Sequence, residues 1–262
     1  MEARISIIAT GDSIGARARE LLQTGYKTII AAGGDGTVNA IAAVLVDTDA
    51  VLGVLPIGGL NHFARDIGVP PDLEGAVRNL ISGAVRSVDV GEVNGRIFVN
   101  NSGLGLYPLL VVERERRRRL GQNKWIAFLR ASIETLRRFP FLHVHLMVEG
   151  RQFARRTPFV FVGNNVCRME GIRLGSRDCL SDGSLFLGVA PRPIGRWGFV
   201  RLAFLALFGH IHARDLDLIV SKEIHITSRR RRVRVSLDGE VTRMETPLHY
   251  RTRPGALKVI VP

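Results

Sequence analysis

The sequence contains a glycine-rich segment whose residue types are suited to holding phosphate. It reads Gly33-Gly34-Asp35-Gly36-Thr37-Val38-Asn39 and stands where an apolar run passes into a helical pattern. Glycines at such a junction let successive backbone N–H groups face one concavity, and the start of a helix adds a positive dipole. The carboxylate of Asp35 indicates that a cation such as Mg²⁺ accompanies the phosphates. The alternative is a plain strand-to-helix turn in which Asp35 or Thr37 caps the helix.

A second glycine-containing turn follows the next apolar run of the chain. It includes Gly58, Gly59 and Asn61, and it again leads into a helical pattern. Two such turns on adjacent parallel strands would both lie at the carboxyl edge of the sheet, where ligands bind. The chain has no G-x-x-x-x-G-K-[ST] segment, which excludes a Walker-type phosphate loop, and no G-x-G-x-x-G after its first strand-like run.

These turns require strands and helices to position them, and the first third of the chain has both patterns. Strands are expected at 4–9, 26–32 and 51–56, and helices at 13–24, 38–45 and 74–82. Strands separated by helices at this spacing predict a parallel α/β sheet.

From residue 88 onward the apolar and polar residues alternate. Strands are expected at 88–93, 96–101, 143–148, 152–163, 184–190, 223–228, 232–237 and 248–250, and helices at 122–139 and 194–212. Alternation of this kind is typical of half-exposed antiparallel strands. The sequence therefore predicts an α/β domain over 1–88, to which a strand at 256–262 could return, and a β-rich domain over 89–255.

Composition narrows the class of protein. The 262 residues are 46% hydrophobic and 23% charged, which argues against disorder, collagen and coiled coil. The two cysteines, Cys167 and Cys179, have no C-x-x-C spacing, which argues against a disulfide scaffold and a cysteine-built zinc site. The start shows no signal-peptide pattern, and the most apolar segment, 197–211, is too short to span a bilayer. A cytoplasmic protein is expected.

The net charge of +13 predicts an anionic partner, which could be nucleic acid, anionic lipid or a phosphorylated substrate. Only four of the 37 basic residues are lysine, an excess of arginine that the codon usage of a GC-rich genome can also produce.

Five motifs in a specific order resemble those of the diacylglycerol kinase and sphingosine kinase superfamily, and especially its bacterial lipid kinases. The segments that carry the resemblance are 33–39, 56–65, 100–105, 180–183 and 237–240, and the closing 254–257 also fits. Together they span nearly the whole chain. The first segment alone is also similar to NAD kinases and phosphofructokinases, whereas 56–65 and 237–240 favour the lipid kinases.

The resemblance implies a fold and an activity. The fold would be an N-terminal Rossmann-like nucleotide-binding domain and a C-terminal antiparallel β-sandwich domain, with the active cleft between them. The activity would be an ATP-dependent, Mg²⁺-dependent transfer of phosphate to a hydroxyl of a lipid such as diacylglycerol or a sphingoid-type lipid. A catalytically weak or inactive lipid- or nucleotide-binding homologue and an NAD kinase-like enzyme are the alternatives.

The resemblance also assigns roles to individual residues. Those at the nucleotide phosphates would be Gly33, Gly34, Asp35, Gly36, Thr37, Val38, Asn39, Ala40, Gly58, Gly59 and Asn61. Glu240 matches the family's proton acceptor, and Asp238 stands beside it as a supporting or metal-linked carboxylate. Asp182, with the backbone of Cys179 and Ser184, corresponds to a second Mg²⁺ site. Without the resemblance, 238–240 is a hairpin turn and Asp182 lies in a polar turn between strands.

The chain departs from the family pattern in three ways. Gly59 stands where the family usually has Thr, and His62 stands where Asp or Asn is common. The first strand and helix of the relatives, with their Asn-Pro-x-Ser-Gly-like turn, have no counterpart here, which suggests a start upstream of Met1 or a sheet that closes differently.

Clusters of arginine at 114–119 and 229–232, beside Trp-bearing helical patterns at 125–129 and 197–208, are typical of docking on anionic membrane. Solvated helix faces or a charged strand edge would also account for them. We expect a lipid substrate at an anionic membrane surface, peripheral association and no nucleic-acid partner, because no stacking platform or recognition helix is evident. An exposed strand could also pair two copies as a homodimer.

Overall fold

The structure is a computed structural model that describes residues 4–8, 13–59, 61–105, 108, 141–165, 168–169, 172–173, 183–189 and 217–262. The chain divides into two compact units: Met1–Val88 with Ala256–Pro262, and Asp89–Gly255. The boundary falls inside two strands, β3 (Ala84–Val93) and β16 (Leu248–Val261), each of which contributes residues to both units.

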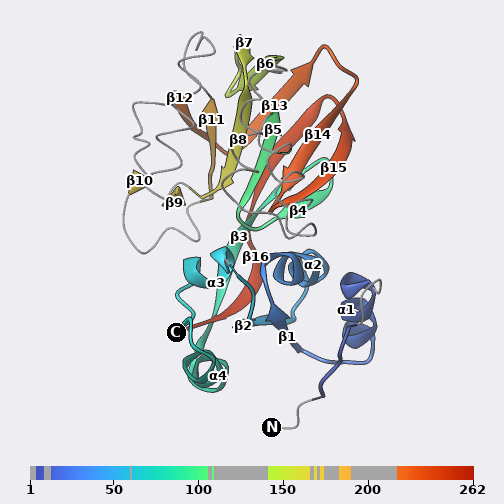
Figure 1. Ribbon diagram of the computed structural model, residues 1–262, viewed down its shortest axis with the longest axis vertical. Helices are drawn as coiled ribbons and strands as arrows, with labels where there is room; N and C mark the ends of the chain where they lie inside the picture. Colours follow the sequence, from blue (N-terminus) through green and yellow to red (C-terminus); the bar gives the residue numbers. More distant parts are fainter. Residues whose placement is uncertain are drawn as a thin grey trace, which may run out of the picture. The chain divides into compact units, whose positions relative to one another are not determined.

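A parallel sheet forms the first unit. Strand β1 (Thr28–Gly33) pairs in parallel with β2 (Val51–Pro56), and β2 pairs in parallel with the last part of β16, where Lys258 lies opposite Val51 (Figure 1). The run of apolar residues in β2 fits a strand that is covered on both faces, because helices cross over a parallel sheet.

Four helices accompany this sheet: α1 (Ile14–Gln23), α2 (Asp35–Leu45), α3 (His62–Asp66) and α4 (Leu73–Ser82). Helix α2 contacts β1 and β2, and its buried residues Val38, Ile41, Ala42 and Leu45 recur at helical spacing. The side chains of Ser13 and Asp72 cap α1 and α4 by accepting backbone N–H bonds.

The second unit is a β-sandwich of two antiparallel layers. One layer has the order β16, β13 (Glu223–Ser228), β6 (Leu142–Val148) and β7 (Arg151–Thr157). The other has the order β12 (Asp217–Ser221), β11 (Leu185–Val189), β8 (Phe159–Asn164), β5 (Asn101–Gly105), β14 (Arg232–Leu237) and β15 (Glu240–Glu245). Strand β4 (Arg96–Phe98) pairs with β3, and β9 (Arg168–Met169) pairs with β10 (Ile172–Arg173).

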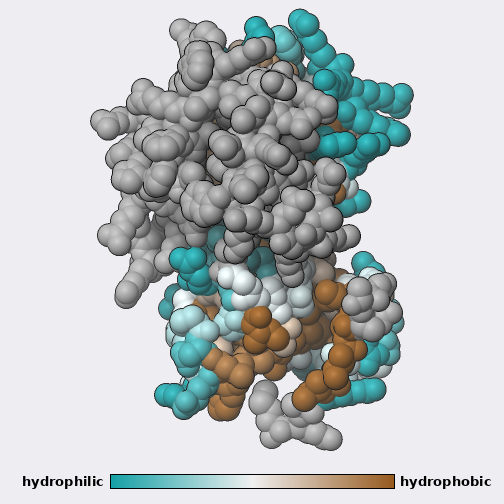
Figure 2. Space-filling model, viewed as in Figure 1, coloured by the Kyte–Doolittle hydropathy of each residue, from teal (hydrophilic) through white to brown (hydrophobic). Residues whose placement is uncertain are grey.

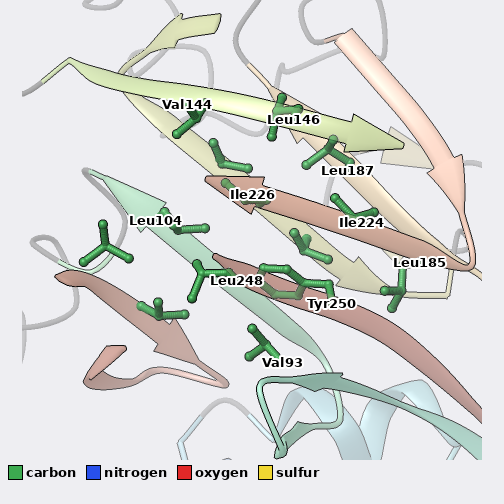
Figure 3. Packing of buried hydrophobic residues seen from close by; sticks show 14 of the residues in the cluster. Val93, Leu104, Val144, Leu146, Leu185, Leu187, Ile224, Ile226, Leu248 and Tyr250 are labelled. Atoms are coloured by element: carbon green, nitrogen blue, oxygen red, sulfur yellow. The ribbon is translucent and has the colours of Figure 1, made fainter. Parts of the chain in front are cut away.

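The core of the sandwich is built from alternate residues of both layers. Figure 3 shows Val144, Leu146, Ile224, Ile226, Leu248 and Tyr250 from the first layer together with Leu104, Leu185 and Leu187 from the second. The hydroxyl of Tyr250 hydrogen-bonds that of Ser102 at 2.9 Å, so these two buried hydroxyl groups satisfy each other. The alternation predicted an antiparallel β-rich unit, and the fold class expected from the sequence is confirmed.

Several predicted elements differ from the structure. Residues 4–8 form no strand. Ile5 and Ile7 are 86% and 92% exposed, and no strand among the described residues pairs with this segment. The single strand expected at 152–163 is two strands, β7 and β8, separated at Pro158, where proline cannot donate to a ladder. The helices expected at 122–139 and 194–212 lie outside the described residues. Among the described residues, no helix has the length and apolar content needed to cross a membrane.

Candidate phosphate-transfer site

The first glycine segment spans the end of a strand and the start of a helix. Gly33 ends β1, Gly34 is the extended N-cap of α2 with φ −93° and ψ −172°, and Asp35 is the first residue of the helix. A Cβ at Gly33 would lie 2.5 Å from Thr37 Oγ1, so only glycine fits there. The first N–H groups of α2 have no acceptor within the helix, and this end can therefore bind an anion.

The second glycine turn packs directly on the first. A Cβ at Gly58 would lie 2.3 Å from Gly34 Cα and 2.9 Å from Gly34 N, so the two backbones approach too closely for any side chain. The nearest of these atoms belongs to the backbone of Gly34, which cannot turn aside as a flexible side chain would. The ends of β1 and β2 therefore present one continuous stretch of bare backbone.

Asn61 shapes the second turn from within. Its backbone is left-handed, with φ 51° and ψ 45°. Its Oδ1 accepts the Gly58 N–H at 3.1 Å, and its Nδ2 donates to the carbonyls of Pro56 and Gly58, both at 2.9 Å. All three bonds lie inside the turn, so the amide of Asn61 holds the glycine backbone in place.

Asp35 links the two turns. Its Oδ1 accepts the backbone N–H of Phe63 in α3 at 3.2 Å. Helix α3 has no side-chain cap from its own N-cap residue, Asn61, so Asp35 supplies that acceptor from another helix. The alternative that Asp35 caps its own helix is not what the structure shows, because the N-cap of α2 is Gly34.

The remaining residues of the first segment differ in exposure. Gly36, Thr37 and Ala40 are half-buried, whereas Val38 and Asn39 are buried on the inner side of α2. The Oδ1 atom of Asn39 is buried and has no hydrogen-bond partner among the described residues. The structure thus brings residues 33–40 together with Gly58 and Asn61.

Gly59 lies at an open position. It is exposed, its φ is not in the left-handed region, and a Cβ built there meets no atom of the described residues within 4 Å. A threonine side chain would therefore fit without displacing a neighbour. His62, the other departure in this turn, is the first residue of α3.

In the second unit, residues 237–240 form a tight hairpin. Leu237 of β14 pairs with Glu240 of β15, and the two residues between them, Asp238 and Gly239, have φ values of 46° and 89°. Positive φ at both central positions is the signature of a two-residue hairpin turn of type I′. The hairpin interpretation of this motif is therefore correct as local structure.

The carboxylate of Asp238 holds a neighbouring loop. Its Oδ2 accepts the N–H of Val99 at 2.7 Å, and its Oδ1 accepts those of Asn100 and Asn101 at 2.8 and 2.9 Å. The backbone N–H of Asp238 also donates to the Asn101 carbonyl at 2.9 Å. These bonds anchor the hairpin, and with it the start of β15, to the strand β5.

Glu240 is in a different situation. It is exposed, and no hydrogen bond or ion pair engages its carboxylate within the part of the chain that the structure describes. Two carboxylates that are two residues apart thus have different surroundings: that of Asp238 accepts three backbone N–H bonds, whereas that of Glu240 is exposed to solvent.

The predicted second Mg²⁺ site falls mostly outside the described residues. Asp182 and Cys179 are not among them. The carbonyl of Ser184 accepts the N–H of Asn165 at 3.1 Å, and a carbonyl oxygen keeps a second lone pair for another partner.

Sequence reasoning missed Asp89, which is only 2% exposed. Its Oδ2 accepts the N–H of Gly183 at 2.7 Å, and its Oδ1 accepts that of Gly255 at 2.8 Å. The Nδ2 atom of Asn164 donates to the Asp89 carbonyl at 2.8 Å and to that of Val99 at 3.1 Å. An acidic residue within an apolar strand was the signal for this network, because a buried carboxylate needs several donors.

A second buried carboxylate, Glu92, pairs with two arginines. Arg251 donates to both of its oxygens at 3.0 Å, and Arg253 donates to Oε2 at 2.6 Å. Burial raises the pKa of Glu92, but the hydrogen bonds from Arg253 and Arg251 outweigh it and hold the pKa below its ordinary value of 4.5.

Comparisons with known proteins agree with this architecture. Residues 2–93 match the diacylglycerol kinase catalytic domain, and residues 110–261 match the YegS C-terminal NAD kinase beta sandwich-like domain. The chain is 32% identical to the diacylglycerol kinase of Bacillus subtilis (strain 168) over 238 residues, covering 88% of this chain and 76% of that protein.

It is also 32% identical over 250 residues to a protein named "Probable lipid kinase YegS-like" from Pseudomonas syringae pv. syringae (strain B728a), covering 93% and 78% of the two chains. A solved structure of a diacylglycerol kinase from Bacillus anthracis str. Sterne has the same fold, with a TM-score of 0.70 and 23% identity over 98% of this chain and 83% of that one. The chain therefore belongs to the family of diacylglycerol kinases and YegS-like lipid kinases.

Proposed function

We propose that the protein transfers the γ-phosphate of MgATP to the hydroxyl of a membrane lipid such as diacylglycerol or a sphingoid-type lipid. The observation that carries the proposal is the backbone contact between Gly34 and Gly58 at the start of α2. Free N–H groups at a helix start, beside backbone that no side chain covers, are suited to the phosphates of a nucleotide.

The residues of the first unit fit a bound nucleotide. A Cβ at Gly33 or Gly58 would collide with neighbouring atoms, whereas the position beside Gly59 is open. Asp35 uses its Oδ1 for Phe63, and a second carboxylate oxygen is a ligand that Mg²⁺ accepts. When bound, MgATP supplies the phosphoryl group with its charge partly neutralised.

The chain's own residues would then bind the phosphates of the nucleotide and accept a proton from the lipid hydroxyl. The N–H groups of α2 would hold phosphate oxygens, and Asp35 would orient the metal-bound phosphate while it keeps α3 in place. Glu240 would accept the proton of the lipid hydroxyl as that oxygen attacks phosphorus. Asp238 would support this role indirectly, because its carboxylate accepts three backbone N–H bonds that position the turn directly before Glu240.

We further propose that the second unit docks on anionic membrane. Several arginines of the second unit are exposed. Four of them, Arg229 to Arg232, are consecutive, and the others are Arg151, Arg234 and Arg243. Glu245 pairs with Arg231 and Arg232 at 3.9 and 2.8 Å, and the net charge of the chain is +13. Figure 2 shows hydrophilic side chains over the region of β14 and β15. Basic clusters of this kind attract anionic lipid.

The test is transfer of labelled γ-phosphate from MgATP into a total lipid extract. We expect label in the organic phase with the wild type and its loss in Asp35→Ala and Glu240→Ala, with folding checked by circular dichroism. Label in a water-soluble nucleotide product would favour an NAD kinase-like enzyme. A folded wild type that binds nucleotide without labelling any lipid would identify an inactive homologue.

Membrane docking has its own test, which does not depend on transfer. The protein is sedimented with liposomes that are anionic or neutral, at low and high salt. Preferential binding to anionic liposomes that weakens with salt would support docking, and equal binding to both would refute it.

A further inference from the structure

Two histidines and a glutamate converge on the solvent-facing side of β13 and β16 in the second unit. We infer that Glu223, His225 and His249 form a binding site for a divalent transition-metal ion such as Zn²⁺. The site is separate from the residues assigned to phosphate transfer, and its assignment does not depend on the proposed function.

Strand register places the three side chains together. His225 of β13 lies directly opposite His249 of β16, and Glu223 is two residues before His225 on the same face. The intervening residues fix that face, because Ile224, Ile226, Leu248 and Tyr250 are fully buried in the sandwich core (Figure 3). A slip of one residue would bury both histidines, so the register that builds the core also builds the cluster.

The potential ligand atoms are already close. One nitrogen or oxygen from each residue lies within 4.8 Å of the other two. The Nε2 atom of His225 is 3.2 Å from Oε1 of Glu223, and Nε2 of His249 contacts the same oxygen. Ligands of a tetrahedral zinc ion with bonds of 2.0–2.2 Å are separated by about 3.3 Å, so the Glu223–His225 spacing fits an ion.

Binding requires the imidazole rings to rotate. The two rings are stacked, with centroids 4.3 Å apart and planes inclined by 6°. In that arrangement the two nitrogen lone pairs run side by side, so the rings must tilt toward each other to share one ion. Their side chains are 32% and 41% exposed, which leaves room for the rotation and a direct path from solvent.

The charges around the cluster permit a cation. Glu223 presents a carboxylate oxygen that contacts Nε2 of both His225 and His249, so the cluster contains an acidic ligand beside the two imidazoles. Arg251, opposite Glu223, directs its guanidinium to Glu92 at 3.0 Å. On the other side of β13, Met147 lies opposite His225, and His145 lies opposite Thr227.

The donor set selects the class of ion. Two imidazole nitrogens and one carboxylate suit Zn²⁺, Ni²⁺, Co²⁺ or Cu²⁺, whereas Mg²⁺ prefers oxygen ligands. Three protein ligands leave a fourth position for water. Since the ligands come from two adjacent strands, the ion would also clip β13 to β16 and stabilise the folded state by mass action.

The experiment titrates ZnCl₂ into the intact, EDTA-treated chain by calorimetry and follows thermal unfolding in parallel. We expect saturable binding of one ion and a rise in the unfolding temperature that EDTA reverses. His225→Ala and His249→Ala should each weaken binding at least about 10-fold, since even outer-shell partners of a metal site cost that much. A 100-fold excess of Mg²⁺ should not displace Zn²⁺.

The matched control is His143→Ala/His145→Ala, which removes two exposed histidines from the neighbouring strand β6. This variant should bind Zn²⁺ like the wild type. If the control loses binding, or if His225→Ala and His249→Ala retain it, the proposed site is wrong. Should either alanine variant unfold, His225→Gln and His249→Gln keep the shape and hydrogen-bonding capacity, and retained wild-type affinity in both would equally overturn the proposal.

Discussion

The close contact between the two glycine turns makes Gly58→Ala a sharp test of the phosphate-binding proposal. The new Cβ would lie 2.3 Å from Gly34 Cα, and ordinary contact begins at 3.4 Å. The two turns must therefore move apart by about 1 Å, a displacement that can cost about 100-fold in catalysis. The strain should also lower the free energy of unfolding by about 1–3 kcal/mol, as overpacking usually does.

The assay measures labelled phosphate transfer into lipid, nucleotide binding by calorimetry and urea unfolding on the same preparations. We expect Gly58→Ala to lose about 100-fold in kcat/KM and to bind nucleotide more weakly, because the N–H groups of the two turns no longer face one ligand. The variant should remain folded at low temperature, since the cores of both units are untouched.

Gly15→Ala is the matched control within the same unit. A Cβ at Gly15 meets its nearest atoms, Ala40 O and Val44 Cγ2, at 3.7 Å, which is ordinary contact. Alanine is the better helix former by about 1 kcal/mol, so this variant should be as stable as the wild type or more so, with unchanged transfer. If Gly58→Ala transferred phosphate and bound nucleotide like Gly15→Ala, the bare backbone at Gly58 would not be part of the site.

Three further predictions concern single side chains. Asp238→Asn should lower the free energy of unfolding, measured in urea, by about 1–3 kcal/mol, because an amide cannot accept all three backbone N–H bonds. Glu240→Gln should abolish transfer and change the free energy of unfolding by less than about 0.5 kcal/mol. Equal losses of stability in the two variants would contradict the proposed division of roles. Gly59→Thr should tighten nucleotide binding about 2- to 10-fold in calorimetry, since the threonine hydroxyl enters open space and can add a hydrogen bond. Weaker binding would show that the nucleotide itself occupies the space beside residue 59. The pKa of Glu92 is lowered in the folded protein, so the stabilisation that its carboxylate gives is complete above pH 4.5 and is lost as the pH falls through the depressed value. Between pH 6 and pH 3.5 the free energy of unfolding in urea should therefore decrease more for the wild type than for Glu92→Gln. Equal decreases would refute the ion pair as the cause.

Local elements were the most predictable part of the structure. The apolar run at 51–56 became β2, the alternating segments at 223–228 and 232–237 became β13 and β14 with the same bounds, and α1 begins after the cap Ser13. Each depends on a short-range rule of periodicity or capping, which acts within a few residues. Residues 4–8 fit the strand pattern, but they pair with no strand among the described residues, and the strand predicted there was wrong.

In the candidate site, too, local features were predictable and long-range contacts were not. The residue types and their order indicated phosphate chemistry, and the family is confirmed, whereas the roles of Asp35, Asp238 and Glu240 in transfer stay predictions. No local pattern shows that Asp35 would accept the N–H of Phe63, 28 residues away, or that Asp238 would hold residues 99–101 across more than 130 residues of chain.

The sequence by itself determined the parallel α/β sheet, the antiparallel β-rich part and the glycine turns at the ends of strands, because hydrophobic period and glycine placement act locally. Tertiary structure alone decided which polar groups meet. The Asp89 bonds to Gly183 and Gly255 and the pairing of His225 with His249 depend on strand register. Register is selected by burying one apolar face of each strand in a shared core, which is a property of the whole fold.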